Sequence, residues 1–408
     1  MATVGETSRP AYGYDSATDT WIPIGIGPHS HTPAAIGAVS SSVVTAKGDL
    51  IVGTSSGVVS NKSVGADGSY LVADSTQTTG VNWAGPSTMA GKNAVINGGF
   101  DIWQRGTSNT YTVGPFYTAD RFTFNCSAVT SVTISQITTS DTTNLPNIYN
   151  AMRVQRTAGN SSTPLVLIQN ALESKDSYRF AGKNVTFSFW ARKGANFSPS
   201  AFTAQLISGT GTDQSLVSGF TNSNGVISES PTLTTTWQRF TYTGTVPSSA
   251  TQLGFQFFVT YAGTAGAADS FDITGVQLEL GSVATPFARA GGTIQGELAA
   301  CQRYYYRVGG NSAYQSFGLG SAKSTTVVAF PVPNPVTMRV NPTAVEYSTL
   351  ICFDGNGFTS AVSAVTLDGP TTNNPRVNVT VTGATQFRPY ELLTNNSTSG
   401  YIGISAEL

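Results

Sequence analysis

The chain has 408 residues, only 11% of them charged, and its formal net charge is −1 at pH 7. This excludes a strongly basic surface, so we expect no nucleic-acid binding. No apolar run approaches the roughly 20 residues that a membrane-spanning helix needs, so we expect no membrane insertion. The length predicts more than one domain, and the 43 glycines favour β-structure with many turns.

Residues 1–44 show little apolar periodicity, and four prolines interrupt any helix. Trp21, Ile22, Ile24 and Ile26 form one short apolar stretch. Because these side chains would otherwise be exposed together, we predict that residues 1–44 attach the chain to a partner or to its own copies. The alternative is an unstructured leader.

The two histidines of the chain, His29 and His31, lie in this segment. In an extended chain their imidazoles point the same way, because side-chain directions repeat every second residue. Three copies of the chain around an axis would supply six imidazoles, enough for octahedral coordination of a transition metal. The alternative is a pair of solvated histidines in a loop.

Residues 45–91 are predicted to form a small β module followed by a linker. Residues 47–53, 64–71 and 80–83 are typical of three short strands joined by Gly and Asp turns, and small residues fill positions 87–91. So few large side chains cannot bury an adequate core. We therefore expect this module to depend on association between copies of the chain.

Residues 92–290 are predicted to form an antiparallel β-sandwich. Every second residue is apolar in residues 185–189 and again in residues 253–259. A period of two places one face of a strand against a core, and clusters of Gly, Asn, Ser and Pro between such runs supply the turns. Trp190 is expected in the core.

Residues 291–308 are predicted to form a linker and the one convincing helix. Thr293 can cap its N-terminus, and an apolar stripe follows at spacings of four, three and four residues, made of Ile294, Leu298, Cys301 and Tyr305. The first three could form part of a seam between parallel copies. Residues 309–408 return to β-structure, with strands at residues 325–330 and 377–381, and form a C-terminal β-domain.

The three cysteines, Cys126, Cys301 and Cys352, are far apart, and no CxxC spacing exists. We expect reduced, buried thiols in a protein assembled in a cytosol. The first six residues have neither the basic nor the apolar region of a signal peptide. Action outside the cell would then require release by lysis rather than secretion.

Several segments of the sequence are similar to a known family. Residues 97–105 read N-G-G-F-D-I-W-Q-R, residues 187–192 read F-S-F-W-A-R, and residues 272–279 read D-I-T-G-V-Q-L-E. Together with residues 237–240 and residues 297–305, they resemble the jelly-roll modules of bacteriophage tail-fibre proteins. These modules are similar in turn to carbohydrate-binding jelly rolls.

The resemblance implies an all-β, elongated, multi-domain fibre with a central β-sandwich of the jelly-roll type, a short helix and a C-terminal β-domain. It implies a structural virion protein, a homotrimer assembled in the host cytoplasm, whose N-terminus binds a phage tail or baseplate protein. Its function would be adhesion to host cell-surface polysaccharide, with residues 309–408 as the distal, host-facing domain. Residues 45–85 also resemble a short module of phage fibres. Trimeric phage fibres with an H-x-H sequence hold a metal ion on the axis, and His29 and His31 resemble such a pair.

A second metal site is implied in the sandwich. Asp101 and Asp272 would lie on its first and last strands, where similar carbohydrate-binding jelly rolls hold a structural calcium ion. The alternative is that these carboxylates cap turns or pair with Arg105 or Arg121.

The sequence offers few candidate catalytic residues. No histidine is close enough to the sandwich to complete a Ser-His-Asp arrangement. A glycosidase needs only two carboxylates, and the candidates are Asp101, Asp120, Asp269, Asp272 and Glu279. We predict no catalytic residues and no enzymatic activity. The alternatives are a fibre-borne glycan depolymerase and a cellular carbohydrate-binding adhesin.

Candidate glycan contacts are aromatic faces, which stack on sugar C–H groups, and neutral amides in turns. They are Trp103, Tyr305, Tyr306, Asn356, Phe358 and Asn373. The last three lie in the segments 355–358 and 370–375, which we predict to be tip loops of the host-facing domain.

Overall fold

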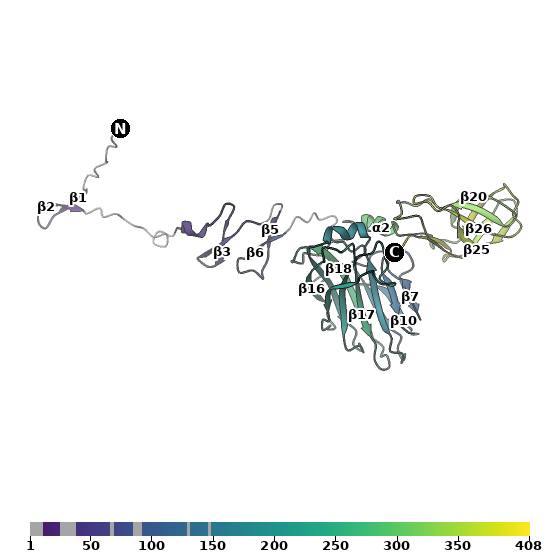
Figure 1. The fold of residues 1–408 in the computed structure, drawn as a ribbon, viewed down its shortest axis with the longest axis horizontal. Helices are drawn as coiled ribbons and strands as arrows, with labels where there is room; N and C mark the ends of the chain where they lie inside the picture. The colour runs from purple at the N-terminus through teal and green to yellow at the C-terminus, as the bar shows by residue number, and fades with distance from the viewer. Residues whose placement is uncertain (1–10, 25–37, 66–68, 85–91, 129–130, 146–147) are drawn as a thin grey trace, which may run out of the picture. The chain divides into compact units, whose positions relative to one another are not determined.

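The computed structural model describes residues 11–24, 38–65, 69–84, 92–128, 131–145 and 148–408. The chain divides into two units, Met1–Pro86 and Ser87–Leu408, and each is considered by itself. The regular secondary structure of the described residues is almost entirely β-strand, with two short α-helices, which confirms the predicted all-β class (Figure 1). None of the described helices is long and apolar enough to span a membrane. The finer domain boundaries remain predictions.

The described residues of the first unit form three two-stranded antiparallel sheets. Their strands are β1 (Ala11–Asp15) with β2 (Thr20–Ile24), β3 (Leu50–Ser55) with β4 (Val58–Lys62), and β5 (Tyr70–Ala73) with β6 (Val81–Ala84). Residues 45–85 thus contain four strands, not the predicted three. The additional strand arises because Gly57, with a φ of 73°, closes a tight turn that returns the chain along β3.

No residue with a described burial in the first unit is buried. A two-stranded sheet has no second layer to cover it, so it is marginally stable by itself. Large apolar side chains are consequently exposed at adjacent positions of the hairpin strands. Because adjacent side chains of a strand point to opposite faces, both faces of the β3–β4 and β5–β6 hairpins carry exposed apolar residues. Leu50 and Ile51 are exposed on β3, Val58 and Val59 on β4, and Tyr70 and Leu71 on β5.

The second unit begins with a sandwich of two six-stranded antiparallel sheets (Figure 1). The first sheet has the order β16 (Gln238–Thr245), β13 (Asn184–Lys193), β18 (Ser270–Leu280), β11 (Asn150–Arg156), β10 (Val132–Thr138) and β7 (Ser108–Tyr111). The second has the order β15 (Asn224–Glu229), β14 (Phe202–Gly209), β17 (Gln252–Thr260), β12 (Leu165–Ala171), β9 (Thr123–Cys126) and β8 (Phe116–Tyr117).

The core between the two sheets is built from the alternating residues that the sequence singled out. Phe187 and Phe189 of β13 face Phe255 and Phe257 of β17, with ring centroids 5.3 Å apart for Phe187 and Phe255 and 4.8 Å for Phe189 and Phe257. All four side chains are fully buried. Each contributes about 1.5–3 kcal/mol of hydrophobic free energy. Trp190 is also buried, as predicted, in a smaller cluster with other side chains of the sandwich.

The helix α2 (Ile294–Gln302) follows the sandwich, and Thr293 caps it as predicted, accepting a hydrogen bond from the Gly296 N–H at 3.0 Å. Tyr305 does not lie on this helix, because the chain has already entered strand β19. Cys301 is fully buried within the chain and therefore cannot lie in a seam between copies. Together with Cys126 and Cys352 it is a free, buried thiol, as expected.

The C-terminal β-domain contains two sheets packed on their own apolar core. The three-stranded sheet has the order β19 (Tyr305–Gly309), β28 (Tyr401–Ser405) and β22 (Ala344–Ser348). The seven-stranded sheet has the order β24 (Thr359–Ala361), β23 (Leu350–Phe353), β27 (Pro389–Thr394), β20 (Ser316–Ala322), β21 (Val327–Pro331), β26 (Arg376–Thr380) and β25 (Ala364–Leu367).

Ion pairs and hydrogen bonds fasten this domain to the sandwich. Glu407 accepts from both Arg105 and Arg121, and Arg339 pairs with Asp213 at 3.0 Å. Arg121 and Glu407 are almost fully buried. Separating the two domains would leave these charges without their partners, and a buried charge that loses its partner is costly.

Candidate ligand-binding cleft

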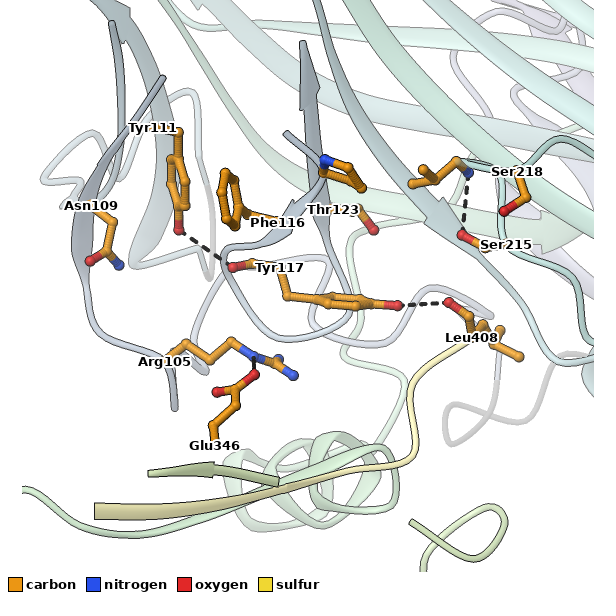
Figure 2. A pocket seen from close by; sticks show the side chains of 12 residues that line it. Arg105, Asn109, Tyr111, Phe116, Tyr117, Thr123, Ser215, Ser218, Glu346 and Leu408 are labelled. Carbon is orange, nitrogen blue, oxygen red and sulfur yellow. Dashed lines mark hydrogen bonds and ion pairs between the residues drawn. The ribbon is translucent and has the colours of Figure 1, made fainter. Parts of the chain in front are cut away.

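A cleft of about 610 Å³ lies where the sandwich meets the C-terminal β-domain. The sandwich contributes β7, β8, the start of β9 and the loop at residues 215–218, and the other domain contributes β22 and Leu408 (Figure 2).

One wall of the cleft is aromatic. Tyr111 of β7 and Phe116 of β8 lie side by side in Figure 2, with ring centroids 5.0 Å apart. Tyr111 also stacks on the core residue Phe124 at 5.3 Å, which fixes its orientation. The side chain of Phe116 is 44% exposed although it belongs to a strand. An aromatic face held in place and left open to solvent is suited to contact a ligand.

Neutral polar groups form much of the remaining lining. They include the amide of Asn109 and the hydroxyls of Thr123, Ser215 and Ser218. The Ser215 hydroxyl accepts a hydrogen bond from the Val217 N–H at 3.2 Å, which orders the loop beside the cleft. Hydroxyls and amides both donate and accept, so this lining matches a ligand that carries many hydroxyl groups.

Tyr117 closes the inner side of the cleft. Its hydroxyl donates to the Leu408 carbonyl oxygen at 2.8 Å (Figure 2). Burial, followed by the negative charge of Glu407, raises the pKa of Tyr117 to about 12. The phenol is therefore neutral at physiological pH and acts as a hydrogen-bond donor, not as an anion.

Arg105 and Glu346 form the charged end of the cleft. The Arg105 guanidinium lies 3.4 Å from the centre of the Tyr305 ring, and its Nε is 3.7 Å from a Glu346 carboxylate oxygen. Burial lowers the pKa of Arg105, but the surrounding acidic groups, Glu407 first among them, together more than offset this, so the pKa is raised. Arg105 thus stays cationic and faces two carboxylates, which leaves no uncompensated positive charge among the described lining residues.

Glu346 is the one carboxylate side chain among the described residues that line the cleft. Asp120 lies nearby but is 1% exposed, and it accepts a hydrogen bond from the Gln104 N–H at 2.7 Å. Burial raises the pKa of Asp120 to about 6. The Asp120 carboxyl is buried and is not among the groups that line the cleft.

The other carboxylates considered for catalysis hold the sandwich together. Asp269 is fully buried and pairs with the equally buried Arg156 at 2.7 Å. Glu279 is also buried and accepts from the Thr285 N–H at 2.9 Å and the Thr285 hydroxyl at 2.7 Å. The carboxylates of Asp269 and Glu279 are therefore engaged in contacts within the sandwich.

Of the two predicted metal sites, only the aspartate site lies among the described residues. His29 and His31 lie outside the described residues. Asp101 pairs with Arg289 at 2.7 Å, and Asp272 pairs with two arginines, Arg153 at 2.8 Å and Arg192 at 2.7 Å.

Both aspartates therefore pair with arginines, though not with the two that we named. A calcium ion takes six to eight oxygen ligands, and the described residues contain no group of three or more His, Cys, Asp or Glu side chains placed to hold a metal. These two carboxylates do not fit such a site in this arrangement, and calcium here remains a prediction without structural support.

The six predicted glycan contacts are not brought together. Tyr305 is fully buried behind Arg105, with its hydroxyl donating to Glu346 at 2.9 Å, and Trp103 donates to the Phe100 carbonyl oxygen at 2.8 Å. The remaining four lie in the C-terminal β-domain and are not among the residues that line the cleft, namely Tyr306, Asn356, Phe358 and Asn373. Their role as ligand contacts remains a prediction.

Sequence reasoning missed Tyr111, Phe116 and Tyr117. A signal was present, because residues 111–117 read Y-T-V-G-P-F-Y, a cluster of aromatics around a Gly-Pro turn. The short connection at residues 112–115 leads from β7, the edge strand of the first sheet, to β8, the edge strand of the second, and so brings the aromatic residues on its two sides together.

No family model and no curated protein sequence matches the chain. Among solved structures, one similar chain is the enzymatically active domain of tailspike protein 4 from bacteriophage CBA120, with 14% identity over 46% of this chain and 21% of that chain and a TM-score of 0.31. Another is TmCBM61 in complex with β-1,4-galactotriose, with 11% identity over 46% of this chain and 99% of that chain and a TM-score of 0.28.

A third is the CBM22-1 xylan-binding domain of Xyn10C from Paenibacillus barcinonensis, with 13% identity over 48% of this chain and all of that domain (100%) and a TM-score of 0.26. The chain thus spans about a fifth of the length of the tailspike domain. Each of the three matches covers less than half of the present chain. TM-scores this low do not establish a common fold.

Proposed function

We propose that this chain is a structural adhesion protein, a tail-fibre protein of a bacteriophage, that binds a neutral glycan of the host surface in the cleft between its sandwich and its C-terminal β-domain. The observation that carries the proposal is the lining of this cleft. Tyr111 and Phe116 offer aromatic faces, and Asn109, Ser215 and Ser218 offer neutral hydrogen-bonding groups around them. Sugars present apolar C–H faces and hydroxyl groups together, and this lining complements both.

The charge of the cleft favours an uncharged ligand. Arg105 already faces Glu346 and Glu407. An acidic sugar would have to displace one of these carboxylates from the guanidinium, whereas a neutral sugar leaves the pairs intact.

Adhesion is favoured over hydrolysis by the number of carboxylates. Glycoside hydrolysis by acid and base requires a pair of them flanking the scissile bond. Glu346 has no second carboxylate side chain beside it among the described residues that line the cleft. A polyvalent adhesin needs no such pair, because several weak contacts become strong when copies act together.

Assembly of three copies on a virion is part of the proposal. Support comes from the first unit, whose hairpins expose apolar residues on both faces and have no core of their own. Copies of the chain would cover both faces at once, whereas a single partner would cover one. In such a homotrimer His29 and His31 would hold a transition metal on the axis, and the N-terminal segment would bind a tail or baseplate protein.

Binding and chemistry can be tested together with the full chain. The native protein and Phe116→Ala are applied to immobilised neutral and acidic polysaccharides, and reducing ends are then assayed. We expect retention on neutral polysaccharides, a loss of roughly tenfold or more in Phe116→Ala, and no new reducing ends.

Two results would contradict the proposal in different ways. Retention that does not depend on Phe116 would place the ligand elsewhere on the chain. Accumulation of reducing ends would identify a depolymerase instead.

A further inference from the structure

A row of polar residues crosses the whole second sheet of the sandwich. In register across its six strands lie Tyr117, Thr123, Gln169, Gln256, Gln205 and Ser228. The residues next to them along the strands, such as Phe124, Ile168 and Phe257, are buried in the core between the sheets. Because side chains alternate along a strand, the polar row faces outward.

Three hydrogen bonds link the side chains of this row into a ladder. Gln169 Nε2 donates to Gln256 Oε1 at 2.9 Å, and Gln256 Nε2 donates to Gln205 Oε1 at 2.7 Å. Gln205 Nε2 then donates to the Ser228 hydroxyl at 3.0 Å. We call Gln169, Gln256, Gln205 and Ser228 the glutamine ladder.

The ladder keeps much of its hydrogen-bonding capacity free. The amides of Gln256 and Gln205 each carry a second N–H, and every amide oxygen has a second acceptor position. Gln169 is 4% exposed, yet its Oε1 has no hydrogen-bond partner. A buried polar atom without a partner is rare in a folded protein and costs about 1–3 kcal/mol. The cost would be recovered if a ligand or ordered water supplied a donor.

The next row along the same strands is apolar at its centre. Leu167 is paired with Phe258, and Phe258 is paired with Thr203. Leu167 and Phe258 are half-buried on the outward face, with Asn125 beside Leu167 and Ser230 beside Thr203. A polar row beside an aliphatic and aromatic row suits a chain that presents hydroxyls and C–H faces along its length. Neither row contains a charged residue.

The polar row that contains the ladder shares two residues with the cleft. Tyr117 and Thr123, the first two members of the row, line the cleft. Gln169 follows Thr123 in register, and its Nε2 also lies 3.5 Å from the carbonyl oxygen of Leu216, in the loop that borders the cleft. Four strand spacings of about 4.8 Å separate β9 from β15, so the row extends for about 19 Å beyond the cleft. This is longer than a single sugar ring.

We propose that the glutamine ladder continues the cleft into one binding surface, which accepts an extended, neutral glycan chain rather than a single terminal sugar. The chain would place its end against the aromatic wall of Tyr111 and Phe116 and run across the strands, with its hydroxyls on the amides and its C–H faces on Leu167 and Phe258. This inference rests on the function proposed for the cleft and specifies the class of glycan.

The experiment measures how affinity depends on glycan length. The probes are oligomers of glucan, galactan, mannan and xylan, each from disaccharide to octasaccharide, applied to the full-length protein. We expect the native protein to bind the long oligomers of its preferred glycan more tightly than the short ones. Gln256→Ala, which removes the centre of the ladder, should weaken octasaccharide binding roughly fivefold, as expected for a lost hydrogen bond, and leave disaccharide binding unchanged.

A matched control is available on the other sheet. Gln155 lies on the outward side of β11 and donates to the Ala267 carbonyl oxygen at 2.9 Å. Gln155→Ala should bind every oligomer as the native protein does. If the ladder merely ties strands together, Gln256→Ala lowers the melting temperature and reduces binding of all lengths equally, and the proposal is overturned.

The remaining outcomes separate this inference from the function of the cleft. Disaccharide binding that Phe116→Ala abolishes, with no further gain for longer oligomers, supports the cleft and overturns the ladder. If the native protein binds none of the probes, the proposed function of the cleft fails for neutral glycans, and the ladder fails with it.

Discussion

At the scale of single residues, Phe387 occupies a backbone conformation that suits glycine. Its φ is 66°, in the left-handed region, where an L side chain costs about 1–2 kcal/mol. The side chain is 81% exposed, so little packing compensates. The Phe387 N–H donates to the Ala322 carbonyl oxygen at 2.9 Å, which holds this conformation in place. We expect Phe387→Gly to raise the free energy of unfolding by up to about 1 kcal/mol in urea denaturation.

Phe387→Ala is the matched control for this prediction. It removes the ring but keeps the Cβ atom that strains the backbone, so its free energy of unfolding should stay close to the native value. Equal gains in both variants would show that the exposed ring, not the backbone conformation, was destabilising.

Asp120 predicts a pH dependence with a defined sign. Its pKa is raised by burial from 3.8 to about 6 in the folded state. The folded chain therefore binds this proton more tightly than the unfolded chain does, and stability rises as the pH falls from about 6 towards 4. Asp120→Asn removes the titration. The native protein should gain roughly 2 kcal/mol relative to this variant between pH 7 and pH 4, measured by urea denaturation. A constant difference, or one of opposite sign, would contradict the burial argument.

At the scale of elements, the helix α2 shows how packing overrides propensity. Alanine is about 1 kcal/mol better than glycine inside a helix, so propensity alone favours Gly296→Ala. However, a Cβ at position 296 would lie 2.1 Å from the Gly291 carbonyl oxygen, which is backbone and cannot simply rotate away. Glu297 holds this approach by accepting from the Gly291 N–H at 2.7 Å and from the Asn97 N–H. We expect Gly296→Ala to destabilise the chain by about 1–3 kcal/mol in thermal or urea unfolding.

The exposed neighbour Gln295 provides the control for the helix. Gln295→Ala also introduces alanine into the first turn, but glutamine is already a good helix former and the position is open to solvent, so it should leave stability nearly unchanged. If Gly296→Ala were instead as stable as the native protein, the close approach of the helix to residue 291 would not constrain the sequence.

At the scale of the whole molecule, the two units differ in what they can do alone. The second unit has large cores of its own, whereas the first has no residue described as buried. We therefore expect the first unit to be stable only in an assembly of copies. Native mass spectrometry should find a trimer of the full chain at micromolar concentration and a monomer after removal of residues 1–86. A trimer that survives this truncation would place the association surface in the second unit.

The sandwich and the cap of the helix could be predicted from the sequence because their signals are local. The alternation in residues 185–189 and 253–259 reports which side of a strand meets a core, wherever the partner strand comes from. Thr293 caps a helix that begins beside it in the chain. The lack of buried residues in the described part of residues 45–85 also followed from composition, because too few large side chains cannot form a core.

The site could not be predicted in the same way. From the sequence alone it could be inferred that strands would pair, that Thr293 would cap a helix and that the surface would be mostly uncharged. The folded chain was needed to see that Tyr111 and Phe116 share a cleft with Glu346, that Asp101 pairs with Arg289 rather than Arg105, and which polar residues align across six strands. The reason is physical: propensity and periodicity act between residues close along the chain, whereas clefts, ion pairs and strand register depend on residues that meet only after folding.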